Sequence, residues 1–185
     1  MLPAGISRRI AGSLTVGDPR DDVDLGPVIN ETQAGRITDI IDRSVKAGAK
    51  VFTGGTRDGL FVRPTVLTGV TPDMPAFAEE IFGPVAAVTS FGTDDEAIEL
   101  ANATPYGLVA GVHAGSAARA LDVGDRLQAS MVHINDQTVN DEPQAPFGGI
   151  GDSGGDSRFG ATVNLEEFTR TQWVTIHRTP SQPEL

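Results

Sequence analysis

The fold and chemistry of this chain are decided by one stretch, Glu79-Glu80-Ile81-Phe82-Gly83-Pro84-Val85. It places two adjacent carboxylates directly before an apolar run, and its glycine–proline pair predicts a turn into a following strand. One interpretation is a charged helix end that exposes both acids to solvent. The other is a binding function, in which one carboxylate accepts hydrogen bonds from the two hydroxyls of a ribose. The stretch alone leaves both interpretations open.

Around this stretch the sequence alternates between helical and extended patterns. Apolar residues recur at helical spacing from about Glu31 to Ala47, and Gly48 can cap the end of that helix. Thr93 and Glu96 have the spacing of a capping box, which predicts a helix running to about Ala103. A further helix is predicted after Ser116, as far as Leu127.

Extended segments lie between these helices. A proline at position 64 cannot donate to a sheet, so we place residues 61–67 at a sheet edge or in an irregular strand. The alternation predicts an α/β fold with a mostly parallel sheet and helices on its faces. The predicted strands and β-like segments are 51–55, 61–67, 85–91, 108–112, 131–134 and 171–178.

Composition narrows the classes of function. The net charge is -11 and no Lys/Arg cluster occurs, which argues against a nucleic-acid partner. No apolar run reaches the ~18 residues of a membrane span, and the N-terminus lacks a signal-peptide pattern, so we expect a soluble, cytoplasmic protein. The chain has no cysteine, and its three histidines show no metal-ligand spacing. No metal site is predicted.

A second signature lies further along the chain. Pro146-Phe147-Gly148-Gly149 is followed by Ser153-Gly154 and Arg158-Phe159-Gly160. Glycines let the backbone pass close to another surface, so Phe147 either packs under a glycine loop or faces a ligand. Asn135 ends the predicted strand 131–134, at the strand end where α/β sheets place their sites. It could contact an active-site loop, but we favour a tie to that loop's backbone through its amide.

These motifs, in this order, resemble the C-terminal half of the NAD(P)-dependent aldehyde dehydrogenases, from Val16 to about Arg178. The resemblance implies a three-layer α/β/α catalytic domain. It also implies that Glu80 binds the nicotinamide ribose, that Phe82 packs by the nicotinamide, and that Phe147 lines the substrate tunnel, near Asn135. Residues 133–142 resemble the branch that acts on benzaldehyde, vanillin and salicylaldehyde. The chain departs from the family pattern at 150–152, where a lysine is usual, and at 155–158, where a glycine normally precedes the arginine.

The resemblance also sets limits on this chain. Residues 1–170 would form a partial catalytic domain, 171–178 an oligomerisation strand and 179–185 a loose tail. The family's nucleophilic cysteine, general-base glutamate and cofactor domain lie upstream of the matched part, so no residue here is predicted to be catalytic. We expect NAD or NADP in the full-length enzyme and no tight binding to this chain alone. An apolar strand without its partner favours self-association, and a homo-oligomer is predicted.

Two other interpretations remain at this point. The chain could be a non-catalytic binding or interaction protein that keeps the fold without the chemistry. It could also resemble an acyl-phosphate reductase, although Glu80, Phe82 and Phe147 together fit that class less well.

Overall fold

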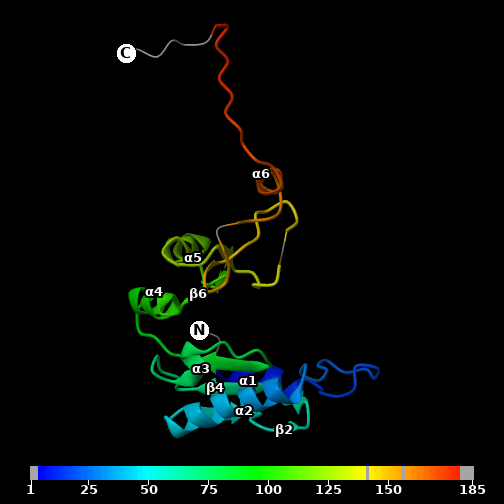
Figure 1. The fold of residues 1–185 in the computed structure, drawn as a ribbon. Coiled ribbons are helices and arrows are strands. Elements are labelled where there is room, and N and C mark those ends of the chain that lie inside the picture. The colour runs from blue at the N-terminus through cyan, green and yellow to red at the C-terminus, as the bar shows by residue number, and fades with distance from the viewer. Residues whose placement is uncertain (1–3, 141, 156, 180–185) are drawn as a thin grey trace. The chain divides into compact units, whose positions relative to one another are not determined.

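The computed structural model describes residues 4–140, 142–155 and 157–179. The chain divides into two units, residues 1–103 and residues 104–185, which are described separately (Figure 1). None of the described helices is long and apolar enough to cross a bilayer.

Helix α2, Glu31–Lys46, organises the first unit. Asn30 caps its N-terminus, and the Asn30 side-chain oxygen accepts a hydrogen bond from the Gln33 N–H at 2.9 Å. It ends at Ala47, and Gly48 follows with a φ of 117°. That backbone angle lies in the region that favours glycine. The predicted helix and its glycine cap are therefore confirmed.

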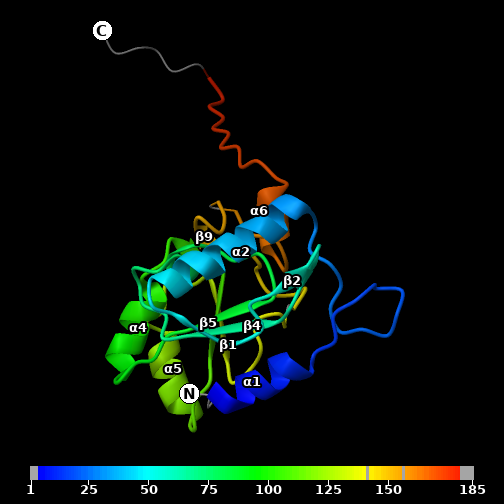
Figure 2. The ribbon, with the colours of Figure 1, turned by 90° about the horizontal axis from the view of Figure 1, so that it is seen from below.

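A three-stranded sheet lies against α2. The order is β1 (Lys50–Thr53), β4 (Thr65–Thr68) and β5 (Val85–Val88), with β1 antiparallel and β5 parallel to β4. Helix α1, Ala4–Ser13, contacts β1 and β4, and Figure 2 shows α1 and α2 on opposite sides of the strands. The core between α2 and the sheet contains the fully buried residues Ile37, Ile40 and Leu67.

Of the two alternatives given for residues 61–67, an edge or an irregular strand, the edge position is wrong for the part that forms β4. The segment divides into β3, Phe61–Val62, which pairs with β2, Arg57–Asp58, and β4, which occupies the centre of the sheet. Pro64 lies between β3 and β4, just before the ladder begins. Its missing N–H therefore costs no ladder hydrogen bond, and the rule that restricts proline to edges does not apply. The predicted irregularity at this point is confirmed.

Two shorter helices complete the first unit. In α3, Pro75–Ala78, the N–H of Ala76 donates to the hydroxyl oxygen of Ser44 on α2 at 2.9 Å, and Ser44 is fully buried. The first turn of a helix has N–H groups without intrahelical partners. Ser44 satisfies one of them from a different helix, and so joins α3 to α2.

Helix α4, Asp94–Asn102, begins as its sequence predicts. The Thr93 hydroxyl accepts from the Glu96 N–H at 3.2 Å, which is the forward half of a capping box. The Glu96 carboxylate accepts in return from the N–H of Gly92 at 2.6 Å, one residue before the expected partner.

The second unit is built on a strand–helix–strand motif. Strands β7 (Val109–Val112) and β8 (Met131–Ile134) pair in parallel, and α5 (Ala117–Gly124) connects and contacts both. The Ser116 hydroxyl caps α5 by accepting from the Arg119 N–H at 3.2 Å, as predicted. The unit also contains the antiparallel pair of β6 and β9 and a short helix α6; their bounds are Tyr106–Gly107, Ile150–Gly151 and Val163–Glu167. The predicted α/β class is confirmed.

The C-terminal segment forms neither a helix nor a strand between residues 171 and 179. Trp173 and Ile176 are 89% and 86% exposed. The segment pairs with none of the described strands of its own chain, so the oligomerisation strand and the homo-oligomer stay predictions. Residues 180–185 of the predicted tail lie outside the described residues.

The Ser44 contact generates a stability prediction. Ser44→Ala leaves the N–H of Ala76 without its buried acceptor, which costs roughly 1–3 kcal/mol. Alanine's better helix propensity offsets about 0.5 kcal/mol. We expect a net loss of about 1–2 kcal/mol by urea denaturation. The exposed Ser90→Ala is the control, and equal stability of both variants would refute the role of Ser44.

Gly35 within α2 and Gly83 packed against it should respond to alanine with opposite signs. A Cβ added to Gly83 would lie 2.4 Å from Cδ1 of the fully buried Ile37, so overpacking should cost about 1–3 kcal/mol. A Cβ on Gly35 meets nothing within 4 Å, and in a helix it should add about 0.5–1 kcal/mol of stability. Thermal or urea unfolding of the two variants checks both signs.

Candidate functional site

Residues 79–83 are fixed to helix α2 at three points. Arg43 Nη2 lies 2.9 Å from Glu79 Oε1, and Gln33 Nε2 donates to the backbone oxygen of Phe82 at 3.0 Å. Gly83 lies so close to the side chain of Ile37 that no Cβ fits between them. The segment is therefore held by a charge pair, a side-chain-to-backbone hydrogen bond and a close packing contact.

Side chains in this segment alternate between two directions. Glu79 is half-buried against α2, and Ile81 packs against the hydrophobic core. Glu80 is exposed, and Phe82 is 73% exposed. Successive side chains of an extended chain point to opposite sides, and Glu79 has extended backbone angles, φ -106° and ψ 141°. The two predicted cofactor residues, Glu80 and Phe82, are thus both exposed, whereas Glu79 and Ile81 are held against α2 and the core.

The two adjacent glutamates have different electrostatic surroundings. Arg43 donates to Glu79 and also, through Nε at 2.7 Å, to Asp39 one helical turn earlier. The hydrogen bond to Glu79, followed by that to Asp39, raises the pKa of Arg43. The Glu80 side chain makes no hydrogen bond or ion pair with any residue that the structure describes. Its carboxylate is free to accept hydrogen bonds from a ligand.

The second predicted region lies at the end of β8. Asn135 has a φ of 56°, a left-handed angle that asparagine tolerates better than most residues. Its N–H donates to the oxygen of Val112 at 2.8 Å, and its side-chain oxygen accepts from the N–H of Ala114 at 2.9 Å. The amide thus ties the loop that follows β7, whereas our prediction placed the tie on the active-site loop. A role for Asn135 in a substrate pocket stays a prediction.

Phe147 lies at the centre of the glycine-rich loop. It exchanges two backbone hydrogen bonds with Phe159, of 2.6 and 3.0 Å, and the two ring centroids are 4.9 Å apart. Arg158 Nη1 donates to the oxygen of Gly149 at 3.0 Å, and a Cβ on Gly148 would collide with the Arg158 side chain. The glycines here permit a close approach of the arginine, which fixes the loop that carries Phe147.

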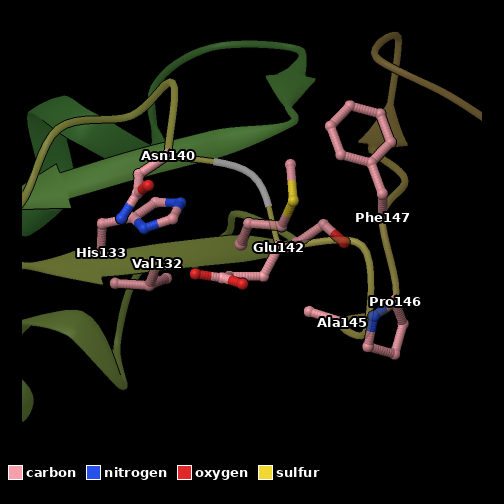
Figure 3. Close-up of a pocket in the computed structure, with 9 residues that line it drawn as sticks. Val132, His133, Asn140, Glu142, Ala145, Pro146 and Phe147 are labelled. Carbon is pink, nitrogen blue, oxygen red and sulfur yellow. The ribbon is translucent and has the colours of Figure 1, made fainter. Parts of the chain in front are cut away.

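Phe147 borders two cavities in the second unit. One, of about 290 Å³, is lined by β8 and by residues of the loop, and Figure 3 shows His133 and Asn140 at one end and Phe147 at the other. The other, of about 390 Å³, lies between Phe147, Phe159 and Asn164. The second combines apolar walls with few polar groups, as sites for small organic ligands commonly do, whereas the first is also lined by Ser130, His133, Asn140 and Glu142.

Polar groups at and next to the first cavity differ in how many hydrogen bonds they make. His133 Nε2 is buried and has no hydrogen-bond partner among the described residues. Beyond β8, the backbone N–H of Gln137 and the side chain of Asn140 donate to Asp136 and lower its pKa, with smaller contributions from His133 and His113. The described residues contain no group of three or more His, Cys, Asp or Glu side chains that could hold a metal ion.

The predicted site residues fall into two pairs. Glu80 and Phe82 lie together in the first unit, and Asn135 and Phe147 belong to the second. Sequence reasoning missed Arg43 and Gln33, and it gave no role to Arg158, which it named only as part of the second signature. The first two bind partners 36 and 49 residues away in the chain, and no local pattern marks such contacts.

Comparison with known proteins agrees with these motifs. Residues 8–174 match the Aldehyde dehydrogenase family. The chain is 48% identical over 172 residues to the benzaldehyde dehydrogenase [NAD(+)] of Pseudomonas putida, which covers 92% of this chain and 35% of that protein. It is 49% identical over 168 residues to a vanillin dehydrogenase of Amycolatopsis sp., covering 90% and 35%.

Solved structures show the same relationship in three dimensions. The NADP-dependent glyceraldehyde-3-phosphate dehydrogenase of Bacillus halodurans, complexed with NADP, superposes with a TM-score of 0.84 at 37% identity, over 88% of this chain and 34% of that one. The succinate-semialdehyde dehydrogenase of Burkholderia pseudomallei gives 0.83 at 36% identity, over 89% and 35%. The chain spans about 35% of the length of the curated relatives it matches. The resemblance seen in the sequence is confirmed, and the chain belongs to the aldehyde dehydrogenase family.

Proposed function

We propose that this chain forms part of the cofactor and substrate site of an NAD(P)-dependent dehydrogenase that oxidises aromatic aldehydes to carboxylic acids. The observation that carries the proposal is the outward projection of Glu80 and Phe82 from a segment whose alternate side chains are held against α2. The substrate class is supported by the names of the relatives, which include benzaldehyde and vanillin dehydrogenases.

The cofactor role follows from the chemistry of the two exposed side chains. A carboxylate that binds none of the described residues, such as that of Glu80, can accept hydrogen bonds from both hydroxyls of a ribose. The ring of Phe82, 73% exposed, offers an apolar face on which a planar ring can pack. Both groups fit a nicotinamide nucleoside, which when bound accepts the hydride of the aldehyde. The chain's own contribution is to bind and orient that group.

The substrate role falls on Phe147. Its ring is half-buried, it borders both cavities of the second unit, and its backbone is fixed by Phe159. An aromatic side chain beside an apolar cavity suits an aromatic substrate through stacking and burial of apolar surface. In this proposal Asn135 acts indirectly, by fixing the end of β8 through its bond to Ala114.

The reaction also needs a nucleophile that this chain does not contain. Oxidation by this route requires a thiolate that attacks the carbonyl and a base that activates water to release the thioester. The chain has no cysteine. We therefore propose that residues 1–185 alone do not oxidise aldehydes, and that sequence outside them supplies the thiolate in the active protein.

The proposal is tested by comparing residues 1–185 with the product of the uninterrupted reading frame that contains them. We expect the shorter protein to produce no NADH or NADPH from benzaldehyde or vanillin. The longer product should oxidise both, with a higher kcat/KM than for an aliphatic aldehyde of similar size. A longer product that binds nicotinamide nucleotides without turning over any aldehyde would favour a non-catalytic binding protein.

Glu80 provides a sharper test within the active protein. Glu80→Gln removes the charged acceptor. Because hydrogen bonds to a charged group are strong, their loss should raise the KM for the cofactor at least ~10-fold. The KM for the aldehyde should change much less. Glu99→Gln, an exposed acid on α4, is the matched control. An unchanged cofactor KM in Glu80→Gln contradicts the proposed ribose contact.

A further inference from the structure

Helix α2 runs alongside residues 79–83 and holds them on both sides of Glu80. Arg43 binds the carboxylate of Glu79 just before it, and Gln33 binds the backbone oxygen of Phe82 just after it. We propose that Arg43 and Gln33 are positioning residues for a nicotinamide nucleotide, because they fix the orientation in which Glu80 and Phe82 reach it. The inference rests on the proposed function.

The contacts hold the backbone and leave the presented side chains free. The Gln33 side chain binds the backbone carbonyl of Phe82, whose ring stays 73% exposed. Arg43 binds Glu79, the neighbour of Glu80 that points toward the helix. Exposed apolar rings and unpaired acids on a loose segment would sample many orientations, and ordering them on binding costs conformational entropy. A segment already fixed on its other side avoids most of that cost.

Arg43 is itself oriented before it reaches Glu79. Its Nε donates to Asp39 Oδ2 at 2.7 Å on the same helix, while its Nη2 lies 2.9 Å from Glu79. A planar guanidinium can make both bonds at once, and an ammonium cannot reproduce that fork. We therefore expect Arg43→Lys to keep only part of the function that Arg43→Ala loses.

Arg43 and Gln33 together form a clamp on residues 79–83. This clamp should matter more for the local order of that segment than for the stability of the whole unit. The Arg43 and Glu79 side chains are 42% and 37% exposed, and ion pairs this accessible to water contribute little to folding. The core of the unit is built from Ile37, Ile40 and Leu67, and substituting the clamp residues leaves these three side chains in place. Loss of the clamp should loosen residues 79–83 and leave the unfolding temperature almost unchanged.

The first experiment uses the 185-residue chain and needs no activity. Amide hydrogen exchange is measured by NMR at Glu79, Gly83 and Val85, whose N–H groups are hydrogen-bonded. In Arg43→Ala and Gln33→Ala we expect exchange at these amides to speed up roughly fivefold. The control is Arg36→Ala, an exposed arginine of the same helix that makes no hydrogen bond or ion pair with the described residues. It should leave these rates unchanged.

The second experiment uses the product of the whole reading frame. Arg43→Ala should raise the KM for the nicotinamide cofactor several-fold, with a smaller change in the KM for the aldehyde, and Arg36→Ala should match the wild type. Arg43→Lys should lie between them. A merely structural role would lower the unfolding temperature without this selective change in the cofactor KM.

The outcomes separate the two proposals. Unchanged exchange at residues 79–85 overturns the clamp, whatever the enzyme does. Faster exchange with an unchanged cofactor KM overturns its positioning role. If the wild-type product oxidises no aldehyde, the proposed function fails, and nucleotide binding then decides whether the cofactor assignment survives. The exchange rates still decide whether α2 holds the segment.

Discussion

The burial of one face of α2 against β4 is the constraint on which the first unit depends. Ile37, Ile40 and Ser44 lie on one face of the helix, and all three are fully buried. The same face of α2 also packs against residues 76–83. There the Ser44 hydroxyl accepts from the N–H of Ala76 in α3, and the Ile37 side chain packs against Gly83. The segment with Glu80 therefore takes its position from the core itself. Packing that stabilises the unit also places the candidate site, so the two cannot vary independently.

Much of the local structure could be read from the sequence because its causes are local. The helix starts at Thr93 and Ser116 were correctly predicted because each cap is a local contact. The hydroxyl oxygen accepts a hydrogen bond from the backbone N–H three residues later, and this needs no partner from elsewhere in the fold. Gly48 was identified as a cap because few other residues adopt its backbone angle. Such features need only a few neighbouring residues, and the rest of the fold does not change them.

Features that depend on distant partners were missed or misplaced. The rule that proline prefers edges put residues 61–67 at an edge, but the position of β4 is set by β1 and β5, which lie on either side of it. The side chain of Asn135 was expected to tie the active-site loop, and it binds Ala114 instead, because β7 ends beside β8. At the site, Glu80, Phe82 and Phe147 were picked out by family motifs, whereas Arg43 and Gln33 belong to no motif. Arg158 belongs to the second signature, but its contact with the glycine-rich loop was not predicted. Sequence reasoning thus found residues that could contact ligands and overlooked those that hold them.

The adjacent glutamates show why such support matters. Glu79 and Glu80 are chemically identical, and an extended segment that slipped by one residue would exchange their directions. Three features oppose that slip: the arginine that accommodates only the acid facing α2, the glycine at the contact with Ile37, and the bond from Gln33 to the Phe82 carbonyl. Each contact is modest by itself, but all three must break together for the segment to shift. Their combined effect is to hold one glutamate against α2 and leave the other exposed, and that asymmetry is the property a ribose-binding carboxylate requires.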